Sequence, residues 1–414
     1  MQSLQTGTAP AATSHARVGA SAVLLVAGFV LISANTRVAF GQIGPLAPVA
    51  GFDASTVTLL GLIPPLVMGL FAPLAVVARR RLGEERALFA AGALLLVGAL
   101  VRMAGMPGLI VGTVVVSSAT AVVNVLVPVF VRKRFAPERT GVMMGVYAMS
   151  MGAGSAVIAA LMVPVFRATG ESWPPAIGLA VIPALLALVG TVPQLRHASR
   201  PDGHPGAHPG AAAHDRPQVL RTWTAWSLTI FFGIQTLLFY ATLAWLPSIL
   251  VAAGVADGTA GNMQALFIVG VAAGGLAAPI LAAASVDQRP HILAIVVVCA
   301  AGFTGLLIAP DTAPVVWALI LGVGLGGGQA VAGVLYARRG HTPDHVAALS
   351  TVAQTGGYLI AATGPILASL LHDATGSWTA PVTAFLVLLA VNAVASMRAG
   401  HDSSREPTRR RPEM

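Results

Sequence analysis

One charged residue, Arg37, lies inside a long apolar run near the N-terminus and is the only charge between Arg17 and Asp53. A helix through this run places the guanidinium far from both helix ends. An arginine at the centre of a bilayer costs on the order of 3 kcal/mol on insertion scales, and it cannot deprotonate to avoid that cost. Arg37 must therefore face water, a protein partner or a bound anion.

Eleven further apolar runs follow, each close to or above the ~20 residues that a membrane-spanning helix needs. Only 9% of the residues are charged and 56% are hydrophobic, which is too apolar for a water-soluble domain. The sequence therefore predicts an all-α membrane protein with twelve transmembrane helices. The expected spans are residues 18–50, 56–78, 87–105, 107–131, 139–168, 173–193, 222–252, 259–284, 291–309, 313–337, 344–371 and 377–397.

Basic residues gather in the segments between alternate apolar runs. All of the 24 lysines and arginines fall in those segments or in the termini, except Arg37, Arg102 and Arg167. Because lysine and arginine are retained on the cytoplasmic side, the pattern predicts a multi-pass protein of the cell membrane with both termini in the cytoplasm. The net charge of +9 thus reflects membrane orientation and does not indicate nucleic-acid binding.

The two halves of the chain repeat each other. A basic cluster, a proline and an Ala-Thr-Gly motif at positions 132, 137 and 168 recur at 338, 343 and 374, which is 206 positions later in each case. Parallel repeats of this kind are one known transporter design, with the substrate site between the halves. The expected regions are a disordered cytoplasmic N-terminus (1–17), a first half (18–193), a linker (194–221), a second half (222–398) and a basic tail (399–414).

The linker is rich in histidine, proline and glycine, so a metal site is an alternative to a simple tether. His197, His204, His208 and His214 are irregularly spaced and have no cysteine near them. Zinc sites use regular ligand spacings, and Pro/Gly-rich segments seldom hold ligands in place. We therefore expect a tether, with no metal and no cofactor.

Acidic residues and histidines are missing from the centres of the expected spans. All 15 acids and all 10 histidines fall in loops, termini or span edges, and His372 with Asp373 comes closest to a span. Arg37 therefore has no carboxylate counter-ion, and an anionic substrate is its simplest partner. The alternative is an arginine held by backbone carbonyls or reaching the membrane interface, which the central position of Arg37 disfavours.

Neutral polar side chains recur at similar depths in both halves, as a shared central cavity requires. Each alone is equally well explained as a hydrogen bond between helices, and Tyr240 and Trp245 could pack as ordinary aromatic residues. Together they predict a substrate cavity lined by Arg37, Asn35, Gln42, Asn124, Tyr147, Gln235, Tyr240, Trp245, Gln329, Gln354 and Tyr358.

The chain resembles the major facilitator superfamily and, within it, the cyanate/2-nitroimidazole porter family. The resemblance covers roughly residues 18–193 and 220–398. It is carried by NTRVAFGQIGPLAP from Asn35, GLFAPLAVVARRRLGEERAL from Gly69, VVNVLVPVFVRKRF from Val122, RTWTAWSLTIFFGIQTLLFYATLAWLP from Arg221 and TVAQTGGYLIAATGPILASLLHDATGSW from Thr351.

Two motifs depart from the family pattern. The family has Asn-Leu-Arg-Pro where this chain has Asn35-Thr36-Arg37-Val38, and if Gly83 is the second glycine of the superfamily loop signature, Arg80 occupies the position of the signature acid. The resemblance makes Gly83 and Arg80 candidates for gating. His372 and Asp373, at the outer end of span 11, are candidates for coupling.

The resemblance implies a secondary transporter that works by alternating access. The expected substrate is a small anionic or weakly acidic polar solute, cyanate-like or nitroimidazole-like. The expected partners are that solute, the lipid bilayer and a proton as candidate coupling ion, with no nucleic acid and a monomeric chain.

Three other functions remain as alternatives. Multidrug export favours a more aromatic pocket than the 6% aromatic content suggests. A membrane-embedded enzyme needs a nucleophile with a base, or metal ligands, in the span centres, so we do not expect an enzyme. A sensor would more naturally carry a soluble output domain, whereas both tails here are short and polar.

Overall fold

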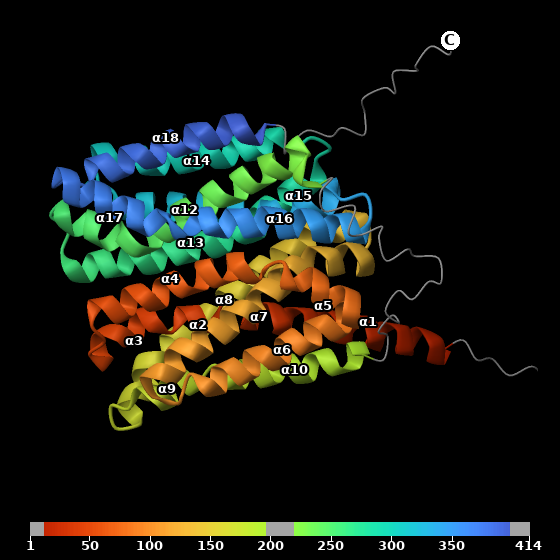
Figure 1. Cartoon of the computed structure of the whole chain (residues 1–414). Helices are drawn as coiled ribbons and strands as arrows, with labels where there is room; N and C mark the ends of the chain where they lie inside the picture. The colour runs from red at the N-terminus through yellow and green to blue at the C-terminus, as the bar shows by residue number, and fades with distance from the viewer. Residues whose placement is uncertain (1–11, 196–218, 398–414) are drawn as a thin grey trace, which may run out of the picture.

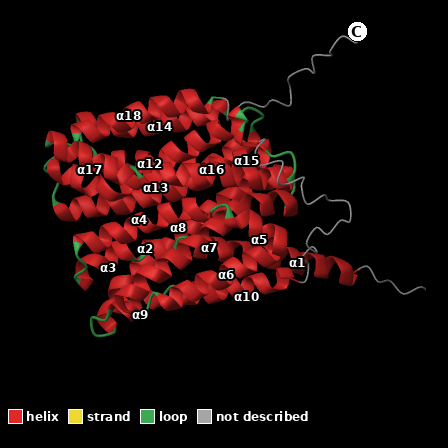
Figure 2. Ribbon diagram, in the orientation of Figure 1, coloured by secondary structure: helices red, strands yellow, loops and turns green. Residues whose placement is uncertain are grey.

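The computed structural model describes residues 12–195 and 219–397, within which every regular element is a helix and no strand occurs (Figure 2). Most of the expected linker and basic tail lies outside these residues. Residues 12–17 are helical, which corrects the expectation of a disordered segment up to residue 17; alanine is the strongest helix former, and two of these six residues are alanine.

The helices of the first half gather in the lower part of Figure 1. They are α1 (Ala12–Asn35), α2 (Val38–Gly41), α3 (Ile43–Ala50), α4 (Ala54–Phe71), α5 (Leu74–Leu82), α6 (Glu84–Val101), α7 (Gly105–Arg134), the 3-10 helix η1 (Pro137–Arg139), α8 (Thr140–Ala168), α9 (Trp173–Gly178) and α10 (Val181–Leu195).

The helices of the second half gather in the upper part of the same view. They are α12 (Trp223–Ala252), α13 (Asp257–Ala284), α14 (Arg289–Ile308), α15 (Pro314–Arg339), α16 (Pro343–Ala362), α17 (Gly364–Thr375) and α18 (Thr379–Ser396).

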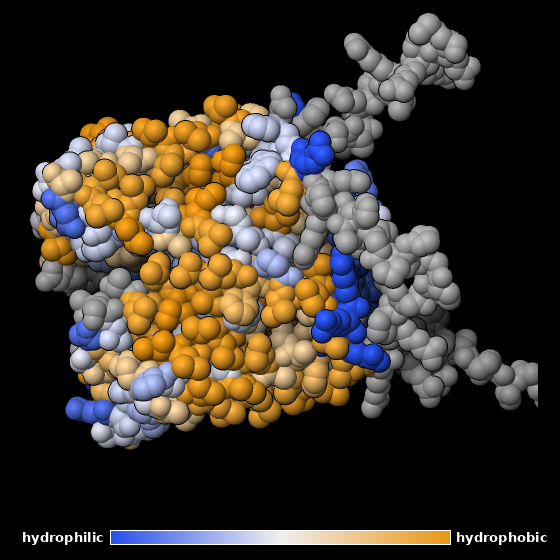
Figure 3. Space-filling view, in the orientation of Figure 1, coloured by the Kyte–Doolittle hydropathy of each residue, from blue (hydrophilic) through white to orange (hydrophobic). Residues whose placement is uncertain are grey.

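Helix is the form these apolar runs must take, because a bilayer offers no hydrogen bonds to an exposed backbone. Among the described residues, eight helices are long and apolar enough to span a membrane, and the bent pair α4–α5 raises the number to nine. The other three expected spans correspond to α1–α3, α6 and α16–α17, which are broken or begin with charged residues. Figure 3 shows the resulting hydrophobic band, with hydrophilic side chains at the ends of the bundle.

Arg37 sits at a break in the first expected span, which is therefore not one continuous helix. Helix α1 ends at Asn35, and α2 begins at Val38. The Thr36 carbonyl, freed from the helix ladder by the break, accepts a hydrogen bond of 3.0 Å from the Thr120 hydroxyl of α7. Broken backbone is tolerated at membrane depth where protein groups satisfy it. The break directs Arg37 toward the second half.

The two halves pack together along two helix pairs, α8 with α13 and α4 with α16. Glycines bring the first pair close: a Cβ atom on Gly141 would lie 2.3 Å from the Ala283 Cβ, and one on Gly145 would lie 2.8 Å from the Leu276 carbonyl oxygen. Small residues let membrane helices approach in this way. These contacts hold the halves together around the centre of the bundle, where the candidate site lies.

Candidate functional site

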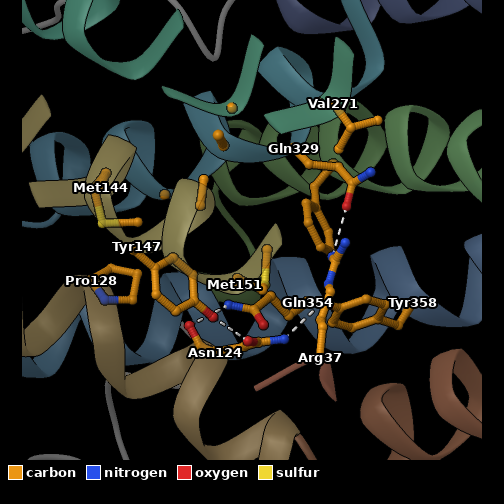
Figure 4. Close-up of a pocket in the computed structure, with 16 residues that line it drawn as sticks. Arg37, Asn124, Pro128, Met144, Tyr147, Met151, Val271, Gln329, Gln354 and Tyr358 are labelled. Atoms are coloured by element: carbon orange, nitrogen blue, oxygen red, sulfur yellow. Dashed lines mark hydrogen bonds between the residues drawn. The ribbon is translucent and has the colours of Figure 1, made fainter. Parts of the chain in front are cut away.

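A cavity of about 70 Å³ lies between the two halves (Figure 4). Helices α7 and α8 line one side, α12, α13, α15 and α16 line the other, and Arg37 reaches in from the break after α1. Its lining residues are Arg37, Asn124, Pro128, Met144, Tyr147, Ala148, Met151, Phe232, Val271, Gly275, Gly326, Gln329, Ala330, Gly333, Gln354 and Tyr358.

Arg37 is the one charged side chain among the described residues that line this cavity. Its Nη2 donates a 2.9 Å hydrogen bond to Oε1 of Gln329 on α15 (Figure 4). Its Cζ lies 5.5 Å from the centre of the Phe239 ring on α12, a cation–π geometry. The guanidinium thus contacts Gln329 and Phe239 on two helices of the second half and also has a side-chain hydrogen bond with Tyr358 of α16; all three partners are uncharged residue types.

Asn124 on α7 links the two halves below Arg37. Its Nδ2 donates to the Tyr358 hydroxyl of α16 at 2.9 Å, and its Oδ1 accepts a hydrogen bond from the Tyr147 hydroxyl of α8. Its backbone oxygen accepts a 3.1 Å hydrogen bond from Nε2 of Gln354. Because this one buried residue holds three side chains from two helices, α8 and α16, the shape of the cavity depends on Asn124.

Six of the eleven residues predicted to line a substrate cavity line the cavity found here, and five lie elsewhere. Gln42 is the clearest departure: its Oε1 accepts from Nη1 of Arg102 at 2.6 Å, and its Nε2 donates to the Ile177 carbonyl at 2.8 Å. Asn35 is buried at the end of α1. Arg102 is fully buried with a neutral partner, a feature that sequence reasoning missed because the partner is 60 positions away.

The remaining three residues lie on α12 outside the cavity lining. Gln235 is buried against Gly328 of α15. Tyr240 packs edge to face on Phe239, the ring below Arg37. Trp245 donates from Nε1 to the Pro365 carbonyl at 3.0 Å, and its ring lies 5.3 Å from that of Trp378. All three side chains therefore lie outside the described cavity lining.

Sequence patterns do not single out the apolar part of the cavity lining. Met144, Met151 and Phe232 complete the walls, and Phe232 packs edge to face on Tyr358 at 5.0 Å. Apolar residues fill every span, so no composition signal separates those that face a cavity from those that face lipid. The rotation of each helix about its axis decides which apolar residues face the cavity, and only the packed structure gives that rotation.

The candidates for coupling lie far from the cavity. The His372 ring stacks on Trp378 with centroids 4.2 Å apart, in the last turn of α17. The neighbouring Asp373 is exposed, and its Oδ2 accepts a 3.4 Å hydrogen bond from Ser369. Neither residue is among those that line the cavity.

At the basic end of the bundle, where α5, α7 and α15 finish in arginine-rich turns, an ion-pair cluster joins the halves. Glu84 accepts hydrogen bonds from Arg79 at 2.8 Å and from Lys133 at 2.6 Å, and Arg79 also forms an ion pair with Asp344 of the second half. Burial alone would raise the pKa of the Glu84 carboxyl, which lies before the apolar part of α6, but the two cations together lower it below its usual value.

The two gating candidates flank this cluster. Gly83 ends α5 with φ 81°, a left-handed conformation suited to glycine, and so lets the chain turn directly into α6. Arg80 is exposed, whereas the neighbouring Arg79 is buried and makes the contact between the halves. The described residues hold no group of three or more metal-ligating side chains; the linker histidines lie outside them.

Comparison with known proteins gives a consistent set of relatives. The sequence model of the Major Facilitator Superfamily matches residues 24–359. The chain is 34% identical over 389 residues to the 2-nitroimidazole transporter of Escherichia coli (strain K12), covering 93% of this chain and 97% of that protein. It is 26% identical over 359 residues to a cyanate transport protein of the same organism, covering 84% and 90%.

Solved structures share the fold at low sequence identity. The E. coli fucose:proton symporter FucP matches with a TM-score of 0.69 and 13% identity, covering 92% of this chain and all of that one. The human organic anion transporter MFSD10 matches with a TM-score of 0.67 and 15% identity, covering 91% and 99%. At these identities the likeness concerns the arrangement of helices alone.

Proposed function

Because the chain belongs to the major facilitator superfamily and, within it, to the cyanate and 2-nitroimidazole porters, we propose that it carries a small anionic or weakly acidic polar solute. The family makes it a multi-pass membrane transporter. The class of solute and the alternating-access mechanism are proposed below.

The observation that carries the proposal is Arg37 in the central cavity with neutral partners. A guanidinium withdrawn from water needs compensation, and a glutamine oxygen with an aromatic ring supplies only part of it. No acid or histidine is present among the described lining residues. A solute that brings negative charge, or a strongly polar acceptor, completes the pairing, and the planar guanidinium suits such groups.

The size of the cavity supports a solute of few atoms. Drug-sized ligands occupy pockets of roughly 300–1,000 Å³, and this cavity has about 70 Å³. Two relatives are described as transporters of 2-nitroimidazole and of cyanate, both small polar solutes. A cyanate-like or nitroimidazole-like substrate therefore fits better than the varied large substrates of a multidrug exporter.

We further propose alternating access by rocking of the two halves, 18–193 and 222–398, about the cavity. Contacts between the halves at the basic end support a state closed on that side. Besides the Arg79–Asp344 pair, Nη1 of Arg132 on α7 donates to the Ala337 carbonyl of α15 at 2.6 Å. Movement of the solute requires these contacts to break and reform.

The test compares two arginines that each bond to a neutral glutamine: Arg37, which is partly buried, and Arg102, which is fully buried. Arg37→Gln removes the charge from the cavity, and Arg102→Gln removes it from a site outside the cavity. Isothermal titration of 2-nitroimidazole and of cyanate into the purified protein should show a loss of much more than tenfold for Arg37→Gln, because charge-assisted contacts are worth several kcal/mol. Arg102→Gln should keep the affinity.

A conservative variant separates charge from geometry. Arg37→Lys should restore only part of the affinity, since an ammonium lacks the planar fork of the guanidinium. Insertion into the membrane should survive in Arg37→Gln, because the variant removes a charge from the bilayer interior. Unchanged solute affinity in Arg37→Gln would contradict the proposal that Arg37 binds the solute.

A further inference from the structure

The orientations of two cavity amides, Gln329 and Gln354, are fixed by the chemistry of their partners. Gln329 faces Nη2 of Arg37 at 2.9 Å, and a guanidinium only donates, so the oxygen of Gln329 must be on that side. Gln354 faces the Asn124 carbonyl at 3.1 Å, and a carbonyl only accepts, so the nitrogen of Gln354 must be there. Neither amide can be flipped without losing its hydrogen bond.

Each amide is left with one buried atom that has no partner among the described residues. These atoms are Nε2 of Gln329, a donor, and Oε1 of Gln354, an acceptor. Buried polar atoms in proteins are nearly always paired, and the exceptions call for a ligand, a water or a function. Both residues line the cavity, so a solute bound there is a partner for these two atoms.

No side chain among the described residues donates a hydrogen bond to Oε1 of Gln354. Asn124 uses its Nδ2 on Tyr358 and its Oδ1 on Tyr147. The Tyr147 hydrogen is therefore already donated, and Nδ2 of Asn124 also donates to the Met68 sulfur at 3.8 Å. The cavity thus presents two kinds of chemistry: donors around Arg37 and Gln329, and one neutral acceptor at Gln354 (Figure 4).

We propose that Gln354 selects solutes that carry an N–H or O–H donor, in addition to the acceptor group that binds Arg37 and Nε2 of Gln329. The inference rests on the proposed role of Arg37 and deepens it by naming the substrate class. Azoles with a free N–H, primary amides and protonated weak acids meet both requirements. Donor-free anions such as cyanate leave the Gln354 oxygen buried and unpaired, which a site built to accept a hydrogen bond penalises.

The experiment uses three azoles of nearly the same size and shape. 2-Nitroimidazole and 4-methyl-2-nitroimidazole keep the ring N–H, whereas 1-methyl-2-nitroimidazole has a methyl group in its place. Isothermal titration into the purified full chain in lipid nanodiscs should show the two N–H azoles binding at least about tenfold more tightly than the 1-methyl compound. The 4-methyl compound controls for the size of the added methyl group.

A variant locates the preference. Gln354→Met keeps a similar volume but has no acceptor oxygen, so the two methylated azoles should bind it with equal affinity. Gln194→Met is the matched control: Gln194 is buried and donates to the Leu25 carbonyl outside the cavity. It should retain the full preference.

The outcomes separate this inference from the proposed function. Equal binding of the 4-methyl and 1-methyl azoles to the unmodified protein, with both weakened in Arg37→Gln, would overturn the donor requirement and leave Arg37 as the solute ligand. Tighter binding of cyanate than of 2-nitroimidazole would overturn it too. Failure of every azole to bind would do the same, because 2-nitroimidazole carries both groups that the proposal requires.

Discussion

Arg79 on α5 forms an ion pair with Asp344 in the first turn of α16, and so connects the two halves at the basic end of the bundle. If Gly83 is the second glycine of the superfamily loop signature, the neighbouring Arg80 occupies the position of the signature acid. In this contact between the halves, the first half supplies the cation, Arg79, and the second half the anion, Asp344. Asp344 also lies at a helix N-terminus, where negative charge is favourable.

Breaking this pair should open the basic end more often. Asp344 is half-exposed and Arg79 is buried, so the pair contributes on the order of 1 kcal/mol. Asp344→Asn should raise the maleimide labelling rate of Ala330→Cys, a position in the cavity lining, by up to about fivefold in a Cys299→Ala background. Asp373→Asn, at the other end, should leave the rate unchanged. An unchanged labelling rate in Asp344→Asn would show that the Arg79–Asp344 pair does not control opening of the basic end.

The lowered pKa of Glu84 makes the basic end sensitive to acid. A carboxyl whose folded pKa lies below its usual 4.5 contributes stability that is fully present above the unfolded pKa and is lost as pH falls through the folded value. The melting temperature of the unmodified protein should therefore approach that of Glu84→Gln as pH drops from 6 to 3. Gln194→Met, which replaces a side chain that does not titrate, should show a nearly constant difference. A difference in melting temperature between the unmodified protein and Glu84→Gln that stays constant with pH would contradict the ion-pair role of Glu84.

Close contact between α13 and α15 should make Gly322 intolerant of any side chain. A Cβ atom there would lie 2.2 Å from the Phe267 carbonyl oxygen, whereas one on Gly92 would meet only Leu188 at 3.8 Å. Gly322→Ala should destabilise the protein by roughly 1–3 kcal/mol, and Gly92→Ala should be neutral or slightly stabilising. Thermal unfolding in detergent measures both. Equal melting temperatures would show that the two helices can separate at little cost.

Membrane orientation follows from the positions of the basic residues and is open to a direct check. Single cysteines at positions 10, 205 and 408 of a Cys299→Ala chain should resist impermeant maleimides in intact cells, since all three are expected in the cytoplasm. Ser172→Cys, in the turn before α9, should react. Labelling at position 10, 205 or 408 in intact cells would contradict the predicted topology.

The helices were predictable because a bilayer demands apolar runs of fixed length, and the family fold is confirmed. The breaks were not predictable, since they depend on distant partners such as Thr120, whose hydroxyl bonds to the Thr36 carbonyl. The same distinction holds for the site. Polar residues within spans must avoid lipid, so most point inward. Gln42 and Trp245, however, form hydrogen bonds outside the cavity, with Arg102 and with the Pro365 carbonyl.

A proton coupled to transport needs a group that carries it. The described cavity lining contains no carboxylate and no histidine, so a proton that crosses with the solute is expected to travel on the solute itself. A weak acid that binds with its N–H intact meets the unpaired Gln354 oxygen, whereas its deprotonated form does not.

A series of 2-nitroimidazoles made more acidic by ring substituents therefore tests the coupling. Affinity and uptake should fall as pH rises through the pKa of each solute, with midpoints that move with the solute. The alternative carrier is His372, whose Nδ1 is buried without a partner among the described residues and whose ring stacks on Trp378. A single midpoint shared by every solute, and abolished in His372→Gln, would place proton coupling at that end of the bundle.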